Sequence, residues 1–202
     1  MIDAMGFVAA GGRSSRMGRD KAWLEIGGRP MIEHVIAALA PVTNRVAIIA
    51  NSQEYDRLGF RVFADSHKNV GPMEAIRTAL SNSSTPRLVM VACDLPLVSS
   101  ELFKFLLSVS GDDKAVVPIG PDGKLEPMCS IYWKEALSAI SDLIRRGERK
   151  VSSLFEQVPT RFVSFEEISH LRGSEFFFEN VNTPSDYARA LARQKRSSPT
   201  CT

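Results

Sequence analysis

Residues 6–21 read GFVAAGGRSSRMGRDK, an apolar run that ends in two glycines and a basic loop. The run over residues 6–10 predicts a short buried strand, and Gly11-Gly12 predicts the turn that ends it. The adjacent glycines let backbone amides face an anion, and four basic side chains lie within residues 13–21. Because ligands of open α/β sheets bind at the carboxyl ends of the strands, this stretch predicts an anion-binding loop at that edge.

Apolar runs and segments of helical period alternate along the rest of the chain. Strands are predicted over residues 45–50, 61–64, 88–92 and 128–132, the last with antiparallel pairing as one option. Helices are predicted over residues 31–39, 72–80, 100–107, 134–145 and 184–193, with Ser100 and Thr183 as N-caps. This alternation predicts an α/β fold of three layers, in which a mostly parallel twisted sheet is flanked by helices.

Length, charge and cysteine content restrict the class of protein. The 202 residues predict a single domain over residues 1–193, and the polar residues 194–202 predict a disordered tail. A net charge of +2, from 25 basic and 23 acidic residues, argues against a general nucleic-acid binder. The sequence has no apolar run of membrane length and no leader pattern, and its cysteines are scattered, so we expect no membrane partner and a reducing, cytoplasmic location.

Two common phosphate-binding motifs do not match the glycine loop. A Walker loop needs four residues between its glycines and then Gly-Lys-Ser/Thr, whereas five residues separate Gly12 from Gly18 and Arg19 follows. The G-x-G-x-x-G dinucleotide fingerprint is absent as well. Composition alone leaves a solvated basic turn as an open alternative to a phosphate cradle.

The loop resembles the signature of the MobA family, the molybdenum cofactor guanylyltransferases, which have Ala-Gly-Gly followed by Arg-Met-Gly and then Asp-Lys. Shorter matches follow in order at Asn51, Asp65, Gly71-Pro72, Cys93-Asp94 and 180–184. The resemblance implies a Rossmann-like nucleotidyltransferase fold and a Mg²⁺-dependent enzyme. Its reaction would transfer GMP from GTP to the terminal phosphate of molybdopterin, releasing pyrophosphate and forming the guanine dinucleotide cofactor.

The resemblance also assigns roles to individual residues. It implies that Arg16, Lys21 and Asp94 are catalytic and that Asp94 holds Mg²⁺. The residues expected to bind nucleotide or pterin are Ala9, Ala10, Gly11, Gly12, Lys21, Asn51, Asp65, Gly71, Asp94, Asn180 and Asn182. Residue types alone leave a simpler interpretation open, because aspartate and asparagine after a strand or before a helix are also typical of turns and caps.

Three positions depart from the family pattern and leave other functions open. Ala9 replaces the usual leucine, Glu74 replaces a small residue and Ala75 replaces glycine. Since Ala9 would lie near the base pocket, a molybdenum cofactor cytidylyltransferase or another small-molecule nucleotidyltransferase remains an alternative. A non-catalytic nucleotide sensor is a further alternative of a different class. Proteins that deliver or accept the molybdenum cofactor are expected partners alongside GTP and molybdopterin.

Overall fold

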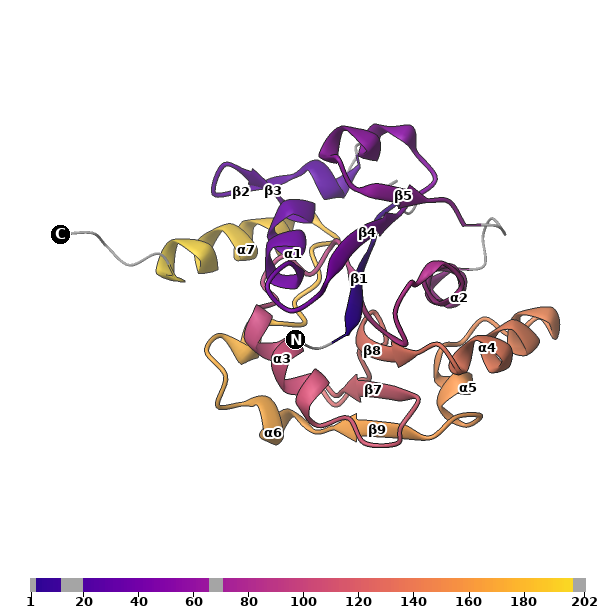
Figure 1. Cartoon of the computed structure of the whole chain (residues 1–202). Helices are drawn as coiled ribbons and strands as arrows, with labels where there is room; N and C mark the ends of the chain where they lie inside the picture. Colours follow the sequence, from indigo (N-terminus) through magenta and orange to yellow (C-terminus); the bar gives the residue numbers. More distant parts are fainter. Residues whose placement is uncertain (1–2, 12–19, 66–70, 198–202) are drawn as a thin grey trace.

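A seven-stranded sheet forms the centre of the molecule (Figure 1). The computed structural model describes residues 3–11, 20–65 and 71–197, with backbone alone for 194–197. In spatial order the strands are β5 (Arg61–Phe63), β4 (Arg45–Ile49), β1 (Ala4–Ala9), β6 (Arg87–Ala92), β8 (Cys129–Trp133), β7 (Ala115–Pro118) and β9 (Thr160–Val163). All neighbours pair in parallel except β8, which runs antiparallel to both β6 and β7.

Helices cover both faces of this sheet (Figure 1). One face carries α1 (Met31–Leu39) and α3 (Ser100–Ser108), and the other carries α2 (Pro72–Asn82), α4 (Ala136–Arg145) and α5 (Ser152–Phe155). The short α6 (Phe165–Ile168) follows β9. The predicted α/β class and three-layer architecture are therefore confirmed.

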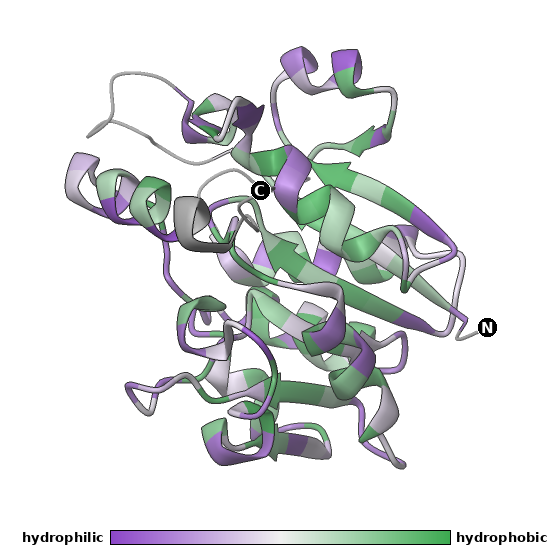
Figure 2. Cartoon of the chain, turned by 90° about the vertical axis from the view of Figure 1, so that its left-hand side faces the viewer, coloured by the Kyte–Doolittle hydropathy of each residue, from purple (hydrophilic) through white to green (hydrophobic). Residues whose placement is uncertain are grey.

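Strand β1 illustrates why the central strands are apolar throughout. Ala4 and Val8 pack with the α1 and α3 side, while Met5 and Phe7 pack with the α2 and α4 side. Because a strand covered on both faces has no solvated side, its sequence is a continuous apolar run rather than an alternating one. Figure 2 accordingly shows the hydrophobic colour concentrated on the central strands.

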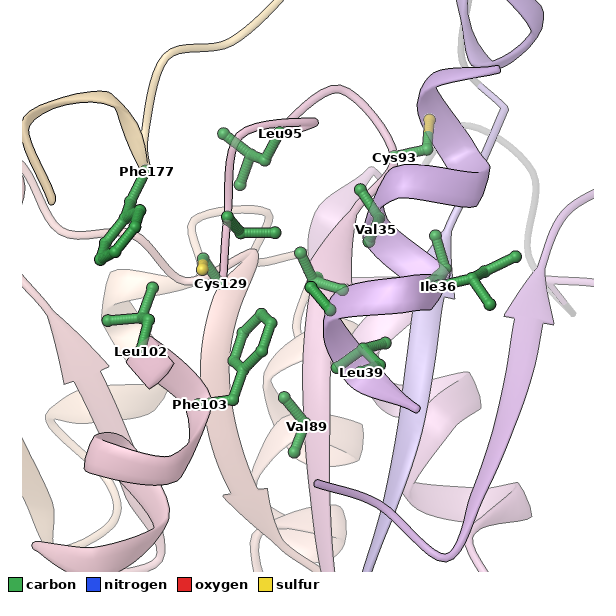
Figure 3. Close-up of a cluster of buried hydrophobic side chains, with 14 of the residues drawn as sticks. Val35, Ile36, Leu39, Val89, Cys93, Leu95, Leu102, Phe103, Cys129 and Phe177 are labelled. Atoms are coloured by element: carbon green, nitrogen blue, oxygen red, sulfur yellow. The ribbon is translucent and has the colours of Figure 1, made fainter. Parts of the chain in front are cut away.

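The larger core cluster joins α1 and α3 to the sheet (Figure 3). Gly6 of β1 permits this close packing, since a Cβ atom there would lie 3.2 Å from both Leu39 Cδ1 and Thr43 Oγ1. The labelled members of the cluster are Val35, Ile36, Leu39, Val89, Cys93, Leu95, Leu102, Phe103, Cys129 and Phe177.

The final helix, α7 (Pro184–Ser197), returns to the N-terminal third of the chain. The Tyr187 hydroxyl donates to the carbonyl of Glu25, 2.5 Å away, next to the hairpin of β2 (Glu25–Ile26) and β3 (Arg29–Pro30). A small core cluster joins these elements through Leu24, Ile26, Met31, Val181 and Ala190. In the part of the chain that the structure describes, no helix combines the length and the apolar character that crossing a membrane requires.

Most of the predicted helices and strands are present, but several begin or end at other residues than predicted. The N-cap of α3 is Ser99, whose hydroxyl accepts from the Leu102 amide, and the expected cap Ser100 is the first helical residue. Helix α7 continues past residue 193, which fits the helix propensity of Gln, Lys and Arg in that segment. The hairpin β2–β3, the edge strand β9 and the short helices were not predicted, because each is too short to show a periodic pattern.

Candidate active site

A cavity of about 830 Å³ opens at the carboxyl edge of the sheet, where β1, β4 and β6 end. Strand order reverses at β1, since β4 and β5 lie on one side and β6 on the other, and this is the crevice where α/β sheets bind ligands. Lining residues expected from the sequence are Ala9, Ala10, Gly11, Lys21, Asn51, Asp65, Gly71, Asp94 and Asn180. Asn182 joins them through Lys21, whereas Gly12 and Arg16 lie outside the described residues.

The Lys21 ammonium group links two segments that are distant in sequence. Its Nζ donates to Asp94 Oδ2 at 2.5 Å and to Asn182 Oδ1 at 2.7 Å. The Lys21 and Asp94 side chains are 19% and 13% exposed, so the pair is screened less than a surface salt bridge. This arrangement places a cation and a carboxylate together in the wall of the cavity.

The second carboxylate oxygen of Asp94 is available for a ligand. Asp94 Oδ1 is buried, and among the residues that the structure describes none is within hydrogen-bond reach of it. A buried carboxylate oxygen without a partner is costly unless something else satisfies it. Hard divalent cations prefer such oxygens, so Asp94 fits the Mg²⁺ that the resemblance of the sequence implies.

The segment before α7 is fixed to the loop after β6. Its Val181 amide donates to the Asp94 carbonyl at 2.9 Å. The Asp186 carboxylate accepts from the amides of Asn182 and Thr183, and the Thr183 hydroxyl accepts from the Asp186 amide, so the predicted capping arrangement is present. These bonds hold Asn182 where its side chain meets Lys21.

A second group of polar residues lies at the ends of β4 and β5. Asn51 Oδ1 accepts from the Asp65 amide at 3.1 Å, and the Thr78 hydroxyl of α2 donates to Asp65 Oδ1 at 3.1 Å. Burial raises the pKa of the Asp65 carboxyl, and the Thr78 hydroxyl partly opposes this. Asn51 thus braces Asp65, whose carboxylate faces the cavity as a hydrogen-bond acceptor.

We expect Asp65→Asn to stabilise the protein at neutral pH. The folded-state pKa of Asp65 lies above its unfolded value, so ionised Asp65 opposes folding, and this penalty grows as the pH rises through the folded pKa. Removing the charge should raise the free energy of unfolding, measured by urea denaturation, by at most about 1 kcal/mol, since solvent screens this half-buried carboxyl. It should also flatten the dependence of stability on pH above about pH 4.

Asp122→Asn provides a control of opposite sign. A hydrogen bond from Lys124 lowers the pKa of Asp122, so its ionised form favours the folded state. That substitution should not stabilise the protein at neutral pH. Equal stabilisation by both variants would contradict the assignment to the buried Asp65.

The unusual Glu74 is neutralised within α2. It is fully buried, and its carboxylate accepts two hydrogen bonds from the Arg77 guanidinium, at 2.6 and 2.9 Å. Gly71, just before the helix, has φ +83° and ψ −153°, a conformation that is almost restricted to glycine. The acidic residue that departs from the family pattern is therefore paired with a cation, and the turn before it requires its glycine.

The Cys93 thiol lines the cavity but is not a nucleophile. Burial raises its pKa to about 12, so it stays protonated at neutral pH. With Lys21 and Asp94 beside it, the described part of the cavity is suited to binding and orienting phosphates rather than to covalent catalysis.

Several cavity residues were not predicted from the sequence: Asp20, Ile49, Ser52, Tyr55, Pro72, Ala75, Ala92, Cys93 and Met128. Most of them adjoin a predicted residue and could have been included as its neighbours. Tyr55 is different, since it lies in η2 (Gln53–Leu58), a 3-10 helix between β4 and β5. No local pattern marks it as a site residue.

Comparison with known proteins places the chain in a family. Residues 6–161 match the model of the MobA-like NTP transferase domain, which is more than half of the chain. The chain belongs to the MobA-like NTP transferase family. This member is therefore a nucleotidyltransferase, and the resemblance inferred from the glycine loop is confirmed.

Curated relatives align with this family member over most of their length. A probable molybdenum cofactor guanylyltransferase of Pelotomaculum thermopropionicum is 37% identical, covering 98% of this chain and 97% of the relative. A protein of the same name from Carboxydothermus hydrogenoformans is 34% identical, covering 91% and 93%. The crystal structure of molybdopterin-guanine dinucleotide biosynthesis protein A from Archaeoglobus fulgidus has a TM-score of 0.82 at 24% identity, covering 95% and 99%, and confirms the fold.

Proposed function

We propose that this family member transfers GMP from GTP to the terminal phosphate of molybdopterin. The observation that carries the proposal is the meeting of Lys21 and Asp94 in the crevice at the carboxyl edge of the sheet. The names of the relatives at 34% and 37% identity supply the base and the acceptor. The cavity volume lies within the range of small-molecule sites.

The reaction needs no protein nucleophile. An oxygen of the acceptor phosphate attacks the α-phosphorus of GTP in line, and a new P–O bond forms. The bond from the α-phosphorus to the oxygen bridging it to the β-phosphorus breaks, and pyrophosphate leaves with that electron pair. Since the acceptor phosphate is already anionic at neutral pH, the chain contributes by positioning and by neutralising charge.

Lys21 and Arg16 would supply positive charge. We propose that both side chains contact the triphosphate. The backbone amides of Gly11 and Gly12 would cradle the phosphates next to them. The ion pair of Lys21 with Asp94 supports this role, because a lysine held at the cavity edge is available to phosphate oxygens. Such donors stabilise the charge that develops in the transition state.

Asp94 would hold Mg²⁺, through the buried oxygen that has no partner among the described residues. When bound, the ion supplies positive charge that neutralises phosphate oxygens. Asp94 would also orient Lys21 toward the triphosphate, since the two side chains are paired.

Different residues would contact the two substrates. Asp65, braced by Asn51, would accept hydrogen bonds from the donor nucleotide, with Ala9, Ala10 and Gly71 leaving room for close approach. Asn180 and Asn182 would face the pterin acceptor. All of these positions lie in the single domain that we propose for residues 1–193.

A pyrophosphate-release assay tests this function. Purified protein is mixed with Mg²⁺, molybdopterin and either GTP, CTP or ATP, and released pyrophosphate is measured. We expect release with GTP and at least about 10-fold slower release with the other donors, the discrimination that one misplaced hydrogen bond provides. Omission of Mg²⁺ or of molybdopterin should abolish release.

Other outcomes of the assay would reject the proposal in distinct ways. Preferred release with CTP would assign the chain to cytidylyl transfer and make Ala9 the residue to change. Nucleotide binding without release by any donor would indicate a sensor or a different acceptor.

A further inference from the structure

The residue before Lys21 is tied to a different part of the fold. Asp20 Oδ1 accepts from the Ala22 amide at 3.1 Å and caps η1 (Lys21–Trp23), while Asp20 Oδ2 accepts from the Tyr55 hydroxyl at 2.6 Å. Tyr55 is fully buried in η2 and lines the cavity. One carboxylate therefore fixes the local backbone of Lys21 and joins it to the β4–β5 connection.

Tyr55 also contacts Trp23, two residues after Lys21. The Trp23 ring stacks on Tyr55 with centroids 5.3 Å apart and planes 28° apart, and the Arg57 guanidinium carbon lies 3.5 Å from the Trp23 ring centroid. Burial raises the pKa of Tyr55 far above its ordinary range, so its hydroxyl stays protonated and able to donate. Lys21 is thus bracketed by two residues that both contact Tyr55.

We propose that Tyr55 is a positioning residue for Lys21, acting through its hydrogen bond to Asp20. A lysine side chain is long and flexible, so the place of its ammonium depends on how firmly its backbone is held. Anchoring Asp20 and Trp23 on η2 keeps Lys21 Nζ between Asp94 and Asn182, ready for the phosphates. The catalytic consequence rests on the proposed function, whereas the positioning itself does not.

Helix η2 begins next to residues that line the cavity. Ser52, which caps η2, and Asn51 beside it follow strand β4 and line the cavity. Asn51 also contacts Asp65, which we assign to the donor nucleotide. The element that anchors Lys21 therefore begins beside the proposed nucleotide site.

The first test measures the accessibility of Lys21 without any substrate. Wild type and Tyr55→Phe are acetylated competitively with acetic anhydride, and the labelling of each lysine is quantified by mass spectrometry. Tyr55→Phe keeps the ring on Trp23 but removes the donor to Asp20. Labelling of Lys21, relative to the exposed Lys104 on α3, should rise several-fold, since a mobile ammonium leaves its ion pair more often.

Tyr132→Phe is the matched control. Tyr132 is also fully buried and its hydroxyl donates to the Pro127 carbonyl at 2.8 Å, but among the described residues no hydrogen bond or ring contact joins it to Asp20, Lys21 or Trp23. This variant should lose similar stability while Lys21 labels as in wild type. Equal Lys21 labelling in Tyr55→Phe and wild type would overturn the proposal.

The second test is a double-mutant cycle on turnover. Tyr55→Phe should lower kcat by roughly 10-fold to 100-fold, the usual cost of a misplaced catalytic group, with a smaller change in KM for GTP. In a Lys21→Ala background the same substitution should have no further effect, because the residue that it positions is gone. Multiplicative losses would show that Tyr55 acts independently of Lys21 and would overturn the proposal.

Asp20→Ala gives an independent variant in case Tyr55→Phe folds poorly. It removes the acceptors of both hydrogen bonds, so it should reproduce the rise in Lys21 labelling. Unchanged labelling in this variant would also contradict the proposal. Absence of GMP transfer in wild type would reject the proposed function, while the labelling result would still decide whether Tyr55 positions Lys21.

Discussion

Lys21→Ala is expected to lower turnover by a factor on the order of 10²–10³, the range for removing one preorganised donor to a developing anion. The Lys21 ammonium is held at the cavity edge by Asp94 and Asn182, so its geometry exists before substrate binds. An alanine there leaves the phosphates without this cation. Steady-state kinetics with GTP and molybdopterin would measure the loss.

The fold should survive this substitution. The pair with Asp94 is largely buried, so its loss should lower the melting temperature by several degrees while the protein stays folded at about 25 °C. Lys134→Ala is the control, because the Lys134 ammonium is likewise part-buried and hydrogen-bonded, to the Ser83 carbonyl, but does not line the cavity. A Lys21→Ala protein that lost its circular dichroism spectrum would contradict the catalytic assignment.

Asp94→Asn is expected to lower turnover by about 10³-fold and to remove divalent-cation binding. The amide preserves the shape of the side chain but not its charge, and the contribution of a bound cation to charge stabilisation amounts to several kcal/mol. Binding of Mn²⁺, followed by electron paramagnetic resonance, gives a measurement that does not depend on turnover. Wild type should bind the ion and Asp94→Asn should not.

Asp142→Asn tests whether any lost carboxylate would have this effect. Asp142 is paired with Arg145 on α4, at the protein surface. Its loss should leave both Mn²⁺ binding and turnover within about 2-fold of wild type. If Asp94→Asn bound Mn²⁺ as tightly as wild type, the metal assignment to Asp94 would be wrong.

The part of the site that sequence predicts is the part built from strand ends. Apolar runs locate β1, β4 and β6, and parallel strands bring their carboxyl ends to one edge, so Gly11, Asn51 and Asp94 are expected to meet. The glycine loop then identifies the family. No side-chain contact across the fold is needed for either inference.

The contacts that orient Lys21 were beyond sequence reasoning. Tyr55 lies 35 residues after Asp20 and Asn182 lies 161 residues after Lys21, and no periodicity links positions so far apart. The position of β8 between β6 and β7 likewise depends on tertiary packing, since β7 precedes β8 in the sequence. Hydrophobic periodicity shows that one side of a helix or strand is buried. It does not show which other element packs against that side.

The separation between Lys21 and Asn182 has a consequence for synthesis of the protein. At translation rates of ~5–20 residues per second, Asn182 is added roughly 8–32 seconds after Lys21, from the 161 residues between them. Throughout that interval β1 and Lys21 are already synthesised, but the segment that meets the ammonium and the helix that fixes this segment are not. A nascent chain therefore has no complete catalytic centre. The centre is complete only when α7 packs against the β2–β3 hairpin, which is synthesised near the start of translation.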